Sequence, residues 1–173
     1  MKKKNSRIYN LTLTGVFAAL ITIFTAYIGH IPVGANGGYV HFGDTLIYLA
    51  ATILPMPYAM AAGAIGGGIA DLLTAPAWTL ATIIIKALLV IPFTNKGSTI
   101  LNKRNYIAPV IAYLISHTGY FIAEAVMFGF EAALLSGLTG GLVQSGGSMI
   151  FFLLLGQTLD KINIKSKVEV ANG

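Results

Sequence analysis

The sequence contains no cysteine, so disulfide bonds, thiolate metal sites and cysteine nucleophiles are excluded. It is also poor in charge, because only 10% of its 173 residues are Asp, Glu, Lys or Arg, whereas 55% are hydrophobic. The mean hydropathy is +0.77, a value that a soluble domain of this size would find hard to keep in solution. The composition therefore argues against a small soluble domain and favours a membrane protein.

The few cations are concentrated at three places, which are the N-terminal tail, one interior loop and the C-terminal tail. They are Lys2, Lys3, Lys4 and Arg7; Lys96, Lys103 and Arg104; and Lys161, Lys165 and Lys167. Cations gather at the cytoplasmic ends of membrane helices, so three clusters separated by even numbers of spans place both termini in the cytoplasm. This pattern orients a membrane protein and differs from a basic face, so no nucleic-acid partner is expected.

The apolar segments predict an all-α integral membrane protein in which residues 1–173 form a single membrane domain. Six transmembrane helices are expected at 8–28, 45–54, 57–73, 77–93, 106–130 and 137–159, with cytoplasmic tails at 1–7 and 161–173. The second helix is short, ~15 Å against a hydrocarbon core of ~30 Å. Six crossings are nevertheless preferred, because without the second helix one basic cluster would lie outside.

Small residues form one face of the first predicted helix, at spacings of three and four. They include Gly15, Ala18, Ala19 and Thr22. Such a face allows another helix to approach closely in lipid, where packing drives association. Packing within the same bundle and docking of a partner protein both remain open.

Polar side chains recur on single faces of three predicted helices. These sets are Trp78, Thr82 and Lys86; Tyr113, His117, Tyr120 and Glu124; and Gln144 and Ser148. Ionisable groups at membrane depth are costly, so they are the default functional hypothesis. Counted from the outer helix ends, Lys86 lies ~14 Å deep, Glu124 ~9 Å and Gln144 ~10 Å, so they are expected in one layer, with His117 deeper at ~20 Å.

Three purely structural alternatives accompany this hypothesis. Lys86 could form an ion pair with Glu124 or with Asp71 that only neutralises buried charge. Asp44 could be the N-cap of the second helix rather than a ligand contact. The loop at 29–44 could be an ordinary connector, although its glycines, with Asn36, Tyr39 and His41, suit a lid over a small polar aromatic ligand.

Signatures of catalysis are missing from the sequence. It has no HExxH or GxSxG motif, no pair of carboxylates placed for acid–base chemistry and no nucleotide-binding motif. We therefore expect no catalytic residues, no metal and no cofactor. If solute movement consumes ATP, another chain must hydrolyse it.

Three segments carry a resemblance to a known family, namely 38–44 (GYVHFGD), 70–73 (ADLL) and 84–88 (IIKAL). Together with six short spans, cytoplasmic termini and a small-residue face on the first helix, they resemble the substrate-binding S component of an energy-coupling factor (ECF) transporter. The similarity covers about residues 8 to 160. It is strongest to the group that handles riboflavin, hydroxymethylpyrimidine and related vitamins.

The resemblance implies a protein of the bacterial plasma membrane that binds a vitamin from outside. It also implies docking through the first helix onto a transmembrane coupling subunit, with two ATPase subunits supplying energy. The docking residues would be Gly15, Ala18, Ala19 and Thr22. The substrate-binding residues would be Asn36, Tyr39, His41, Trp78, Lys86, His117, Tyr120, Glu124 and Gln144.

The single Trp78 is a poor match to a tryptophan-lined thiamine site, so hydroxymethylpyrimidine or a pyridoxine-like ring is favoured and riboflavin comes next. The alternative is a stand-alone secondary transporter with Glu124, His117 and Lys86 as a proton relay. Against it, the six spans show no inverted repeat with paired broken helices. A purely structural membrane subunit is a third interpretation.

Overall fold

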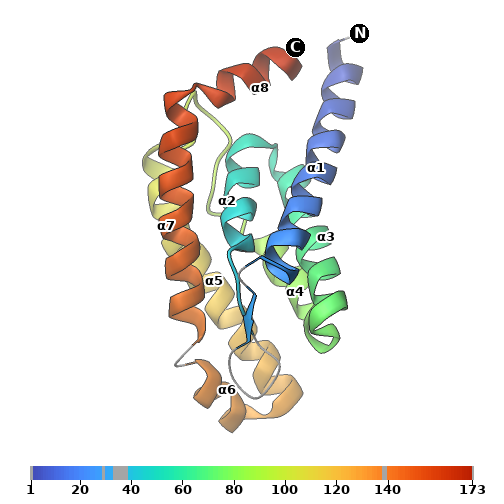
Figure 1. Cartoon of the computed structure of the whole chain (residues 1–173), viewed down its shortest axis with the longest axis vertical. Helices are drawn as coiled ribbons and strands as arrows, with labels where there is room; N and C mark the ends of the chain where they lie inside the picture. Colours follow the sequence, from blue (N-terminus) through green and yellow to red (C-terminus); the bar gives the residue numbers. More distant parts are fainter. Residues whose placement is uncertain (1, 29, 33–38, 138–139, 173) are drawn as a thin grey trace.

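The computed structural model describes residues 2–28, 30–32, 39–137 and 140–172. Both termini lie at one end of a long helical bundle, and α6 lies at the other end (Figure 1). The described part is helical, as predicted, except for two short antiparallel strands that pair Ile31 with Val40. In chain order the elements are α1 (Lys2–Ala26), β1 (Ile31–Pro32), β2 (Tyr39–Val40), α2 (Gly43–Ile53), α3 (Met56–Thr74), a 3-10 turn (Pro76–Trp78), α4 (Thr79–Leu88), α5 (Lys103–Phe128), α6 (Phe130–Gly137), α7 (Gly140–Lys161) and α8 (Ile164–Asn172).

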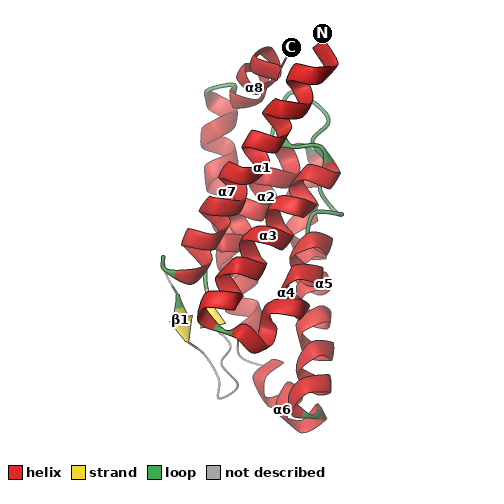
Figure 2. Cartoon of the chain, turned by 90° about the vertical axis from the view of Figure 1, so that its right-hand side faces the viewer, coloured by secondary structure: helices red, strands yellow, loops and turns green. Residues whose placement is uncertain are grey.

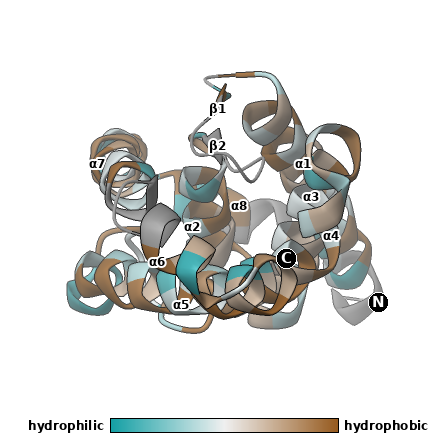
Figure 3. Ribbon diagram, turned by 90° about the horizontal axis from the view of Figure 1, so that it is seen from below, coloured by the Kyte–Doolittle hydropathy of each residue, from teal (hydrophilic) through white to brown (hydrophobic). Residues whose placement is uncertain are grey.

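The outside of the bundle is apolar. Large hydrophobic side chains are exposed along several helices, for example Leu11, Leu80, Ile107, Val126 and Leu154. Seen from the α6 end, the ribbon is brown over much of the outer helices (Figure 3). Among the described residues, the segments Ser6–Ala26 and Lys103–Phe128 are long and apolar enough to cross a membrane, whereas Gly43–Ile53 and Pro76–Leu88 are apolar but shorter. An apolar surface of this extent is typical of a protein that faces lipid.

Helix α2 is the centre of the core. Nine of its eleven residues are buried, which is the pattern of a helix enclosed by protein. Its Tyr48 ring stacks on Phe93 at 4.8 Å and meets the edge of Phe152 at 5.8 Å. Helix α2 is only ~16 Å long, and Figure 1 shows that it begins in the middle of the bundle, next to the two short strands.

Helices α1 and α3 are in close contact, and Figure 2 shows them side by side. A Cβ on Gly66 would lie 2.7 Å from the Ala18 carbonyl oxygen and 2.7 Å from Ile21 Cβ. The Thr22 hydroxyl donates a 3.0 Å hydrogen bond to the Gly66 carbonyl. Only glycine permits this backbone approach, so Gly66 fixes α1 against α3.

The chain between α4 and α5 is held by side chains at the end that carries the termini. The Asp160 carboxylate accepts hydrogen bonds from the amides of Ile100 (2.6 Å) and Leu101 (2.9 Å). Asn105, which is fully buried, donates to the carbonyls of Thr94 and Ile100. These contacts satisfy backbone groups that no helix pairs, so the loop is an ordered part of this end.

Some predicted helix boundaries are wrong. The helix expected at 106–130 begins at Lys103 and ends at Phe128, because Gly129 has a φ of +96° and breaks it before the separate helix α6. The helix expected at 77–93 ends at Leu88. Strands β1 and β2 lie in the segment predicted as a loop, and the C-terminal tail contains α8.

Candidate functional site

A buried ion pair is the centre of the site. The Lys86 ammonium, near the end of α4, lies 2.6 Å from Asp44 Oδ1 in the first turn of α2, and neither side chain is more than 3% exposed. The sequence-based alternatives, pairing of Lys86 with Glu124 or with Asp71, are wrong for this lysine. Two opposite charges in contact avoid the full cost of burying either charge alone.

Gln144 and His41 complete the polar cluster around the pair. Gln144 Nε2 donates to Asp44 Oδ2 at 3.2 Å and lies 3.1 Å from His41 Nε2, while its Oε1 accepts from the His41 amide at 2.6 Å. Burial, together with the nearby Lys86 charge, lowers the pKa of His41 to about 3, so its ring is neutral at physiological pH. The cluster therefore joins α2, α4, α7 and the segment before α2.

Glycines of α3 make room for the lysine. A Cβ on Gly67 would lie 2.8 Å from Lys86 Cγ, and a Cβ on Gly63 would lie 2.8 Å from the Lys86 carbonyl oxygen. The glycine-rich sequence of α3 thus allows α4 to pack closely enough for the Lys86 side chain to lie between helices. Gly63 and Gly67 therefore support the site by leaving room for Lys86.

A second polar group lies next to the ion pair. The Thr82 hydroxyl, one helical turn from Lys86, donates to the Asp71 carboxylate and lies 2.9 Å from the Tyr120 hydroxyl. The Tyr120 ring in turn lies 5.4 Å from Lys86 Nζ, within cation–π range. This group holds the Tyr120 ring beside the ion pair.

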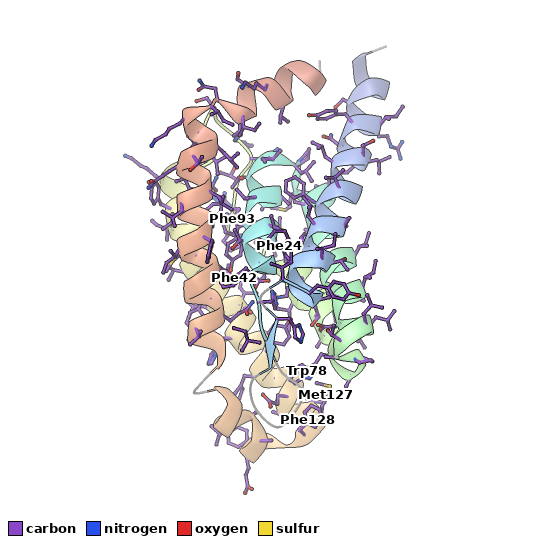
Figure 4. The ribbon with its side chains drawn as sticks, viewed as in Figure 1. Phe24, Phe42, Trp78, Phe93, Met127 and Phe128 are labelled. Carbon is purple, nitrogen blue, oxygen red and sulfur yellow. The ribbon has the colours of Figure 1, made fainter. Side chains whose placement is uncertain are left out.

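Aromatic rings form the part of the site nearest α6. The Trp78 ring meets Tyr120 edge-on at 5.9 Å and lies 5.8 Å from Phe128. Figure 4 shows Trp78, Met127 and Phe128 together near the α6 end of the bundle. Along α4 and the turn before it, Trp78, Thr82 and Lys86 follow at four-residue intervals, so one face presents an aromatic, a hydroxyl and an ammonium in turn.

Four of the predicted binding residues lie in one cluster. Lys86 contacts the Tyr120 ring, and His41 contacts Gln144. Asp44 joins these two pairs, because it contacts both Lys86 and Gln144. Trp78 joins them through Tyr120. Glu124 is buried one turn beyond Tyr120, but no hydrogen bond or ion pair joins it to Lys86 or Gln144 in the described part of the chain. Lys86 and Gln144 therefore lie together as predicted, but the carboxylate beside them is Asp44 rather than Glu124.

The remaining predicted binding residues are placed as follows. The His117 ring lies 5.5 Å from Tyr113 on the same helix. Tyr39 belongs to β2, and Asn36 lies outside the described residues. The roles of His117, Tyr39 and Asn36 in binding stay predictions.

The capping role considered for Asp44 is wrong. The N-cap position of α2 is Phe42, whose side chain makes no capping hydrogen bond, and the amide of Gly43 donates to His41 Nδ1 at 2.9 Å. Asp44 is instead the second residue of α2, fully buried, with both carboxylate oxygens engaged by Lys86 and Gln144. The sequence-based prediction started this helix at Thr45, whereas α2 begins at Gly43, so Asp44 lies within its first turn.

The four predicted docking residues divide between two environments. Ala18 is buried, and Thr22 bonds to Gly66, so both face α3. Gly15 and Ala19 are exposed, and a Cβ on Gly15 would meet no atom within 4 Å. Of the four predicted docking residues, Gly15 and Ala19 therefore lie on the exposed side of α1.

Fold and site together define a helical membrane protein with a buried polar and aromatic site near one end of its bundle. The family model described as ECF-type riboflavin transporter, S component, matches residues 5–161. The chain belongs to this family of ECF transporter S components. It is therefore the substrate-binding subunit of a transporter and not an enzyme, and its family implies a small vitamin substrate and partnership with coupling and ATPase subunits.

A protein from Pyrococcus woesei named "Uncharacterized protein in gap 3'region" is 30% identical over 111 residues. The aligned part covers 63% of this chain and 74% of that protein. Its name states no substrate.

Proposed function

We propose that the chain captures a heteroaromatic vitamin at the α6 end and delivers it to an ATP-driven import complex. The observation that carries this proposal is the Asp44–Lys86 ion pair, which lies beside the amide of Gln144 and an aromatic wall of Trp78 and Tyr120. A flat ring fits against aromatic faces, and the amide offers both a donor and an acceptor to a ring edge. Asn36, Tyr39, His41, His117 and Glu124 remain part of the proposed site.

Riboflavin is the first ligand to test, because the family model bears its name. Hydroxymethylpyrimidine and pyridoxine are the next candidates, since each combines a small heteroaromatic ring with hydroxyl and ring-nitrogen groups. All three could engage the Gln144 amide and pack against Trp78. The order of their affinities identifies the vitamin.

Binding is expected to be saturable, with one ligand per purified chain. Trp78 is the only tryptophan in the chain, so its emission is a local probe. Riboflavin bound beside Trp78 is expected to quench that emission. Calorimetry measures the binding of ligands that do not quench it. The proposal is contradicted if none of the three vitamins binds.

Replacing Gln144 by alanine is expected to weaken binding by about 1–3 kcal/mol, because a buried polar partner is left unpaired. The measurement is the dissociation constant of the vitamin that binds. Gln157→Ala is the matched control, since Gln157 is exposed on the same helix and its loss is expected to leave affinity unchanged. Equal affinities of both variants would place the site elsewhere.

Docking on the coupling subunit is proposed to use the exposed Gly15 and Ala19 side of α1. Close helix approach tolerates only small side chains, so Ala19→Trp is expected to prevent co-purification with the coupling subunit while the isolated chain still binds its vitamin. Normal recovery of the complex would show that α1 docks through another face.

Proteoliposomes that contain the chain alone are expected to show no proton-driven uptake, and accumulation there would favour the secondary transporter.

The topology is proposed to have six crossings of the plasma membrane and cytoplasmic termini, supported by the three basic clusters. Because the chain lacks cysteine, single cysteines can be introduced without background labelling. In intact cells, an impermeant thiol reagent is expected to label a cysteine at Asn36 and to leave cysteines at the exposed positions Lys103 and Lys167 unlabelled. Labelling at Lys167 but not at Lys103 would reject an even number of crossings.

A further inference from the structure

A cavity lies at the end of the bundle that carries the termini, away from the proposed vitamin site (Figure 1). Its volume is about 110 Å³, whereas pockets that enclose drug-sized ligands usually measure roughly 300–1,000 Å³. This volume equals the share of about four water molecules in liquid water. The cavity is therefore large enough for one small polar group and too small for a vitamin.

Helices α1 and α8 and the loops before α3 and α5 line this cavity. Its polar lining residues are Asn10, Asn95 and Lys165, and its apolar lining residues include Leu13, Pro55 and Val168. Figure 1 shows that α8 turns away from the end of α7 and runs across this end of the bundle toward α1. Helix α8 therefore brings a lysine and a valine over the beginning of α1.

Lys165 carries a positive charge into the cavity. Its side chain is only 4% exposed, and its ammonium donates to the carbonyl oxygens of Asn95 at 2.8 Å and Thr99 at 3.4 Å. Hydrogen bonds to carbonyl groups fix the position of the ammonium without neutralising its charge. Because a charge is costly to bury, an ammonium in this position favours an anionic group next to it.

Asn10 is a buried polar residue whose side chain lacks a hydrogen-bond partner. It is 7% exposed and lines the same cavity. Its backbone carbonyl accepts from the Thr14 hydroxyl, but within the described part of the chain its side-chain amide makes no hydrogen bond. An unpaired buried amide costs free energy, and an oxygen atom of a ligand would accept from its NH₂ group. Asn10 and Lys165 thus offer a neutral and a charged donor to one occupant.

The surroundings of the cavity suit a lipid. Asn10 lies ~6 Å along α1 from the start of the apolar segment Ser6–Ala26, near the level of the lipid headgroups. Large apolar side chains are exposed at this end, namely Ile8, Leu11 and Ile162. A lipid whose headgroup entered the cavity would leave its acyl chains against such side chains.

The charge of this end selects an anionic lipid. Ten of the eleven Lys and Arg residues belong to the three basic clusters, and all three clusters lie at the end that carries the termini. The carboxylates in these parts of the sequence are Asp160 and Glu169. Basic pockets between helices on the cytoplasmic side of a membrane protein bind anionic headgroups.

We propose that this cavity binds the phosphate group of an anionic phospholipid of the cytoplasmic leaflet, with Lys165 and Asn10 as donors. Inorganic phosphate presents similar oxygen atoms, but the apolar lining and the exposed apolar side chains nearby favour the lipid. This inference goes beyond the proposed function, because it concerns a different site and its test requires no vitamin.

The experiment titrates the purified full chain in a mild detergent with phosphatidylglycerol and, separately, with phosphatidylcholine. The midpoint of thermal unfolding, followed by circular dichroism, reports binding, because a ligand of the folded state stabilises it. Both lipids contain a phosphate, but only phosphatidylglycerol has a net negative charge. Its half-maximal concentration is expected to be at least about tenfold lower than that of phosphatidylcholine. Equal responses to the two lipids overturn the proposal.

Lys165→Gln is expected to raise the half-maximal concentration of phosphatidylglycerol at least about tenfold, because a hydrogen bond to a charged group is lost. Lys167→Gln is the matched control, since it removes the same charge from an exposed position on the same helix. Its effect is expected to be about threefold or less. Equal effects of the two substitutions would show that the lipid responds to surface charge alone, and would overturn the cavity as its site.

Asn10→Ala tests the cavity without changing any charge, and it decides the proposal if Lys165→Gln does not fold. It is expected to raise the half-maximal concentration at least about threefold, whereas Thr12→Ala, at an exposed position of the same helix, leaves it unchanged. Equal effects of Asn10→Ala and Thr12→Ala overturn the proposal. Inorganic phosphate is expected to leave the midpoint unchanged. If inorganic phosphate instead raises the midpoint and abolishes the response to phosphatidylglycerol, the cavity binds free phosphate and the lipid is rejected.

Discussion

Lys86→Met is expected to lower the free energy of unfolding by about 3–5 kcal/mol, because removing the ammonium leaves Asp44 as an uncompensated buried charge. Within the described part of the chain, the fully buried Asp44 carboxylate would keep the 3.2 Å hydrogen bond from Gln144 alone. Thermal unfolding of the purified protein in detergent, followed by circular dichroism, measures the loss. Lys161→Met is the matched control, since Lys161 is exposed and its replacement is expected to change stability by less than about 0.5 kcal/mol.

The double variant Asp44→Asn with Lys86→Met is expected to recover much of the lost stability. Asparagine has a similar shape to aspartate and carries no charge, so the buried charge left by the single variant disappears. A double-mutant cycle over the four proteins gives the interaction energy of the pair. If the double variant is no more stable than Lys86→Met, the cost lies in lost packing of the lysine stem rather than in the unpaired carboxylate.

Gly66→Ala is expected to lower the free energy of unfolding by about 1–3 kcal/mol, because its Cβ would lie 2.7 Å from a backbone oxygen of α1 and force the two helices apart. The same substitution at Gly15 is the matched control. A Cβ there meets no atom within 4 Å, and alanine is preferred over glycine in a helix by up to about 1 kcal/mol. The two variants are therefore expected to shift the midpoint of thermal unfolding in opposite directions, and equal shifts would show that α1 and α3 do not pack closely at Gly66.

Composition and charge were sufficient to predict the helical membrane fold, because apolar length and basic clusters depend on lipid rather than on tertiary detail. The family was predicted from a resemblance in the segments 38–44, 70–73 and 84–88. The ends of the helices were harder to predict from the sequence. The break at Gly129 depends on one residue with positive φ, in a segment that reads as continuously apolar. The hairpin of β1 and β2 has only two residues per strand, too few to give an alternating pattern.

For the site, periodicity placed Trp78, Thr82 and Lys86 on one face correctly, and it also selected Gln144. His41 was selected from the composition of the loop before the second helix. It could not identify Asp44 as the partner of Lys86, because that depends on how deep α2 starts in the bundle. It assigned Asp71 only as a possible partner of Lys86, whereas the structure bonds it to Thr82. Distances between helices arise from packing, and a linear sequence does not contain them.

The contact between α1 and α3 also bears on how the protein is made. Every residue in it, from Ala18 to Gly66, precedes the end of α3 at Thr74. The ribosome therefore synthesises both sides of this contact before it reaches α5, which begins at Lys103 and carries Tyr120. During membrane insertion, α1 and α3 have the groups they need to pair with each other before the whole chain has been made.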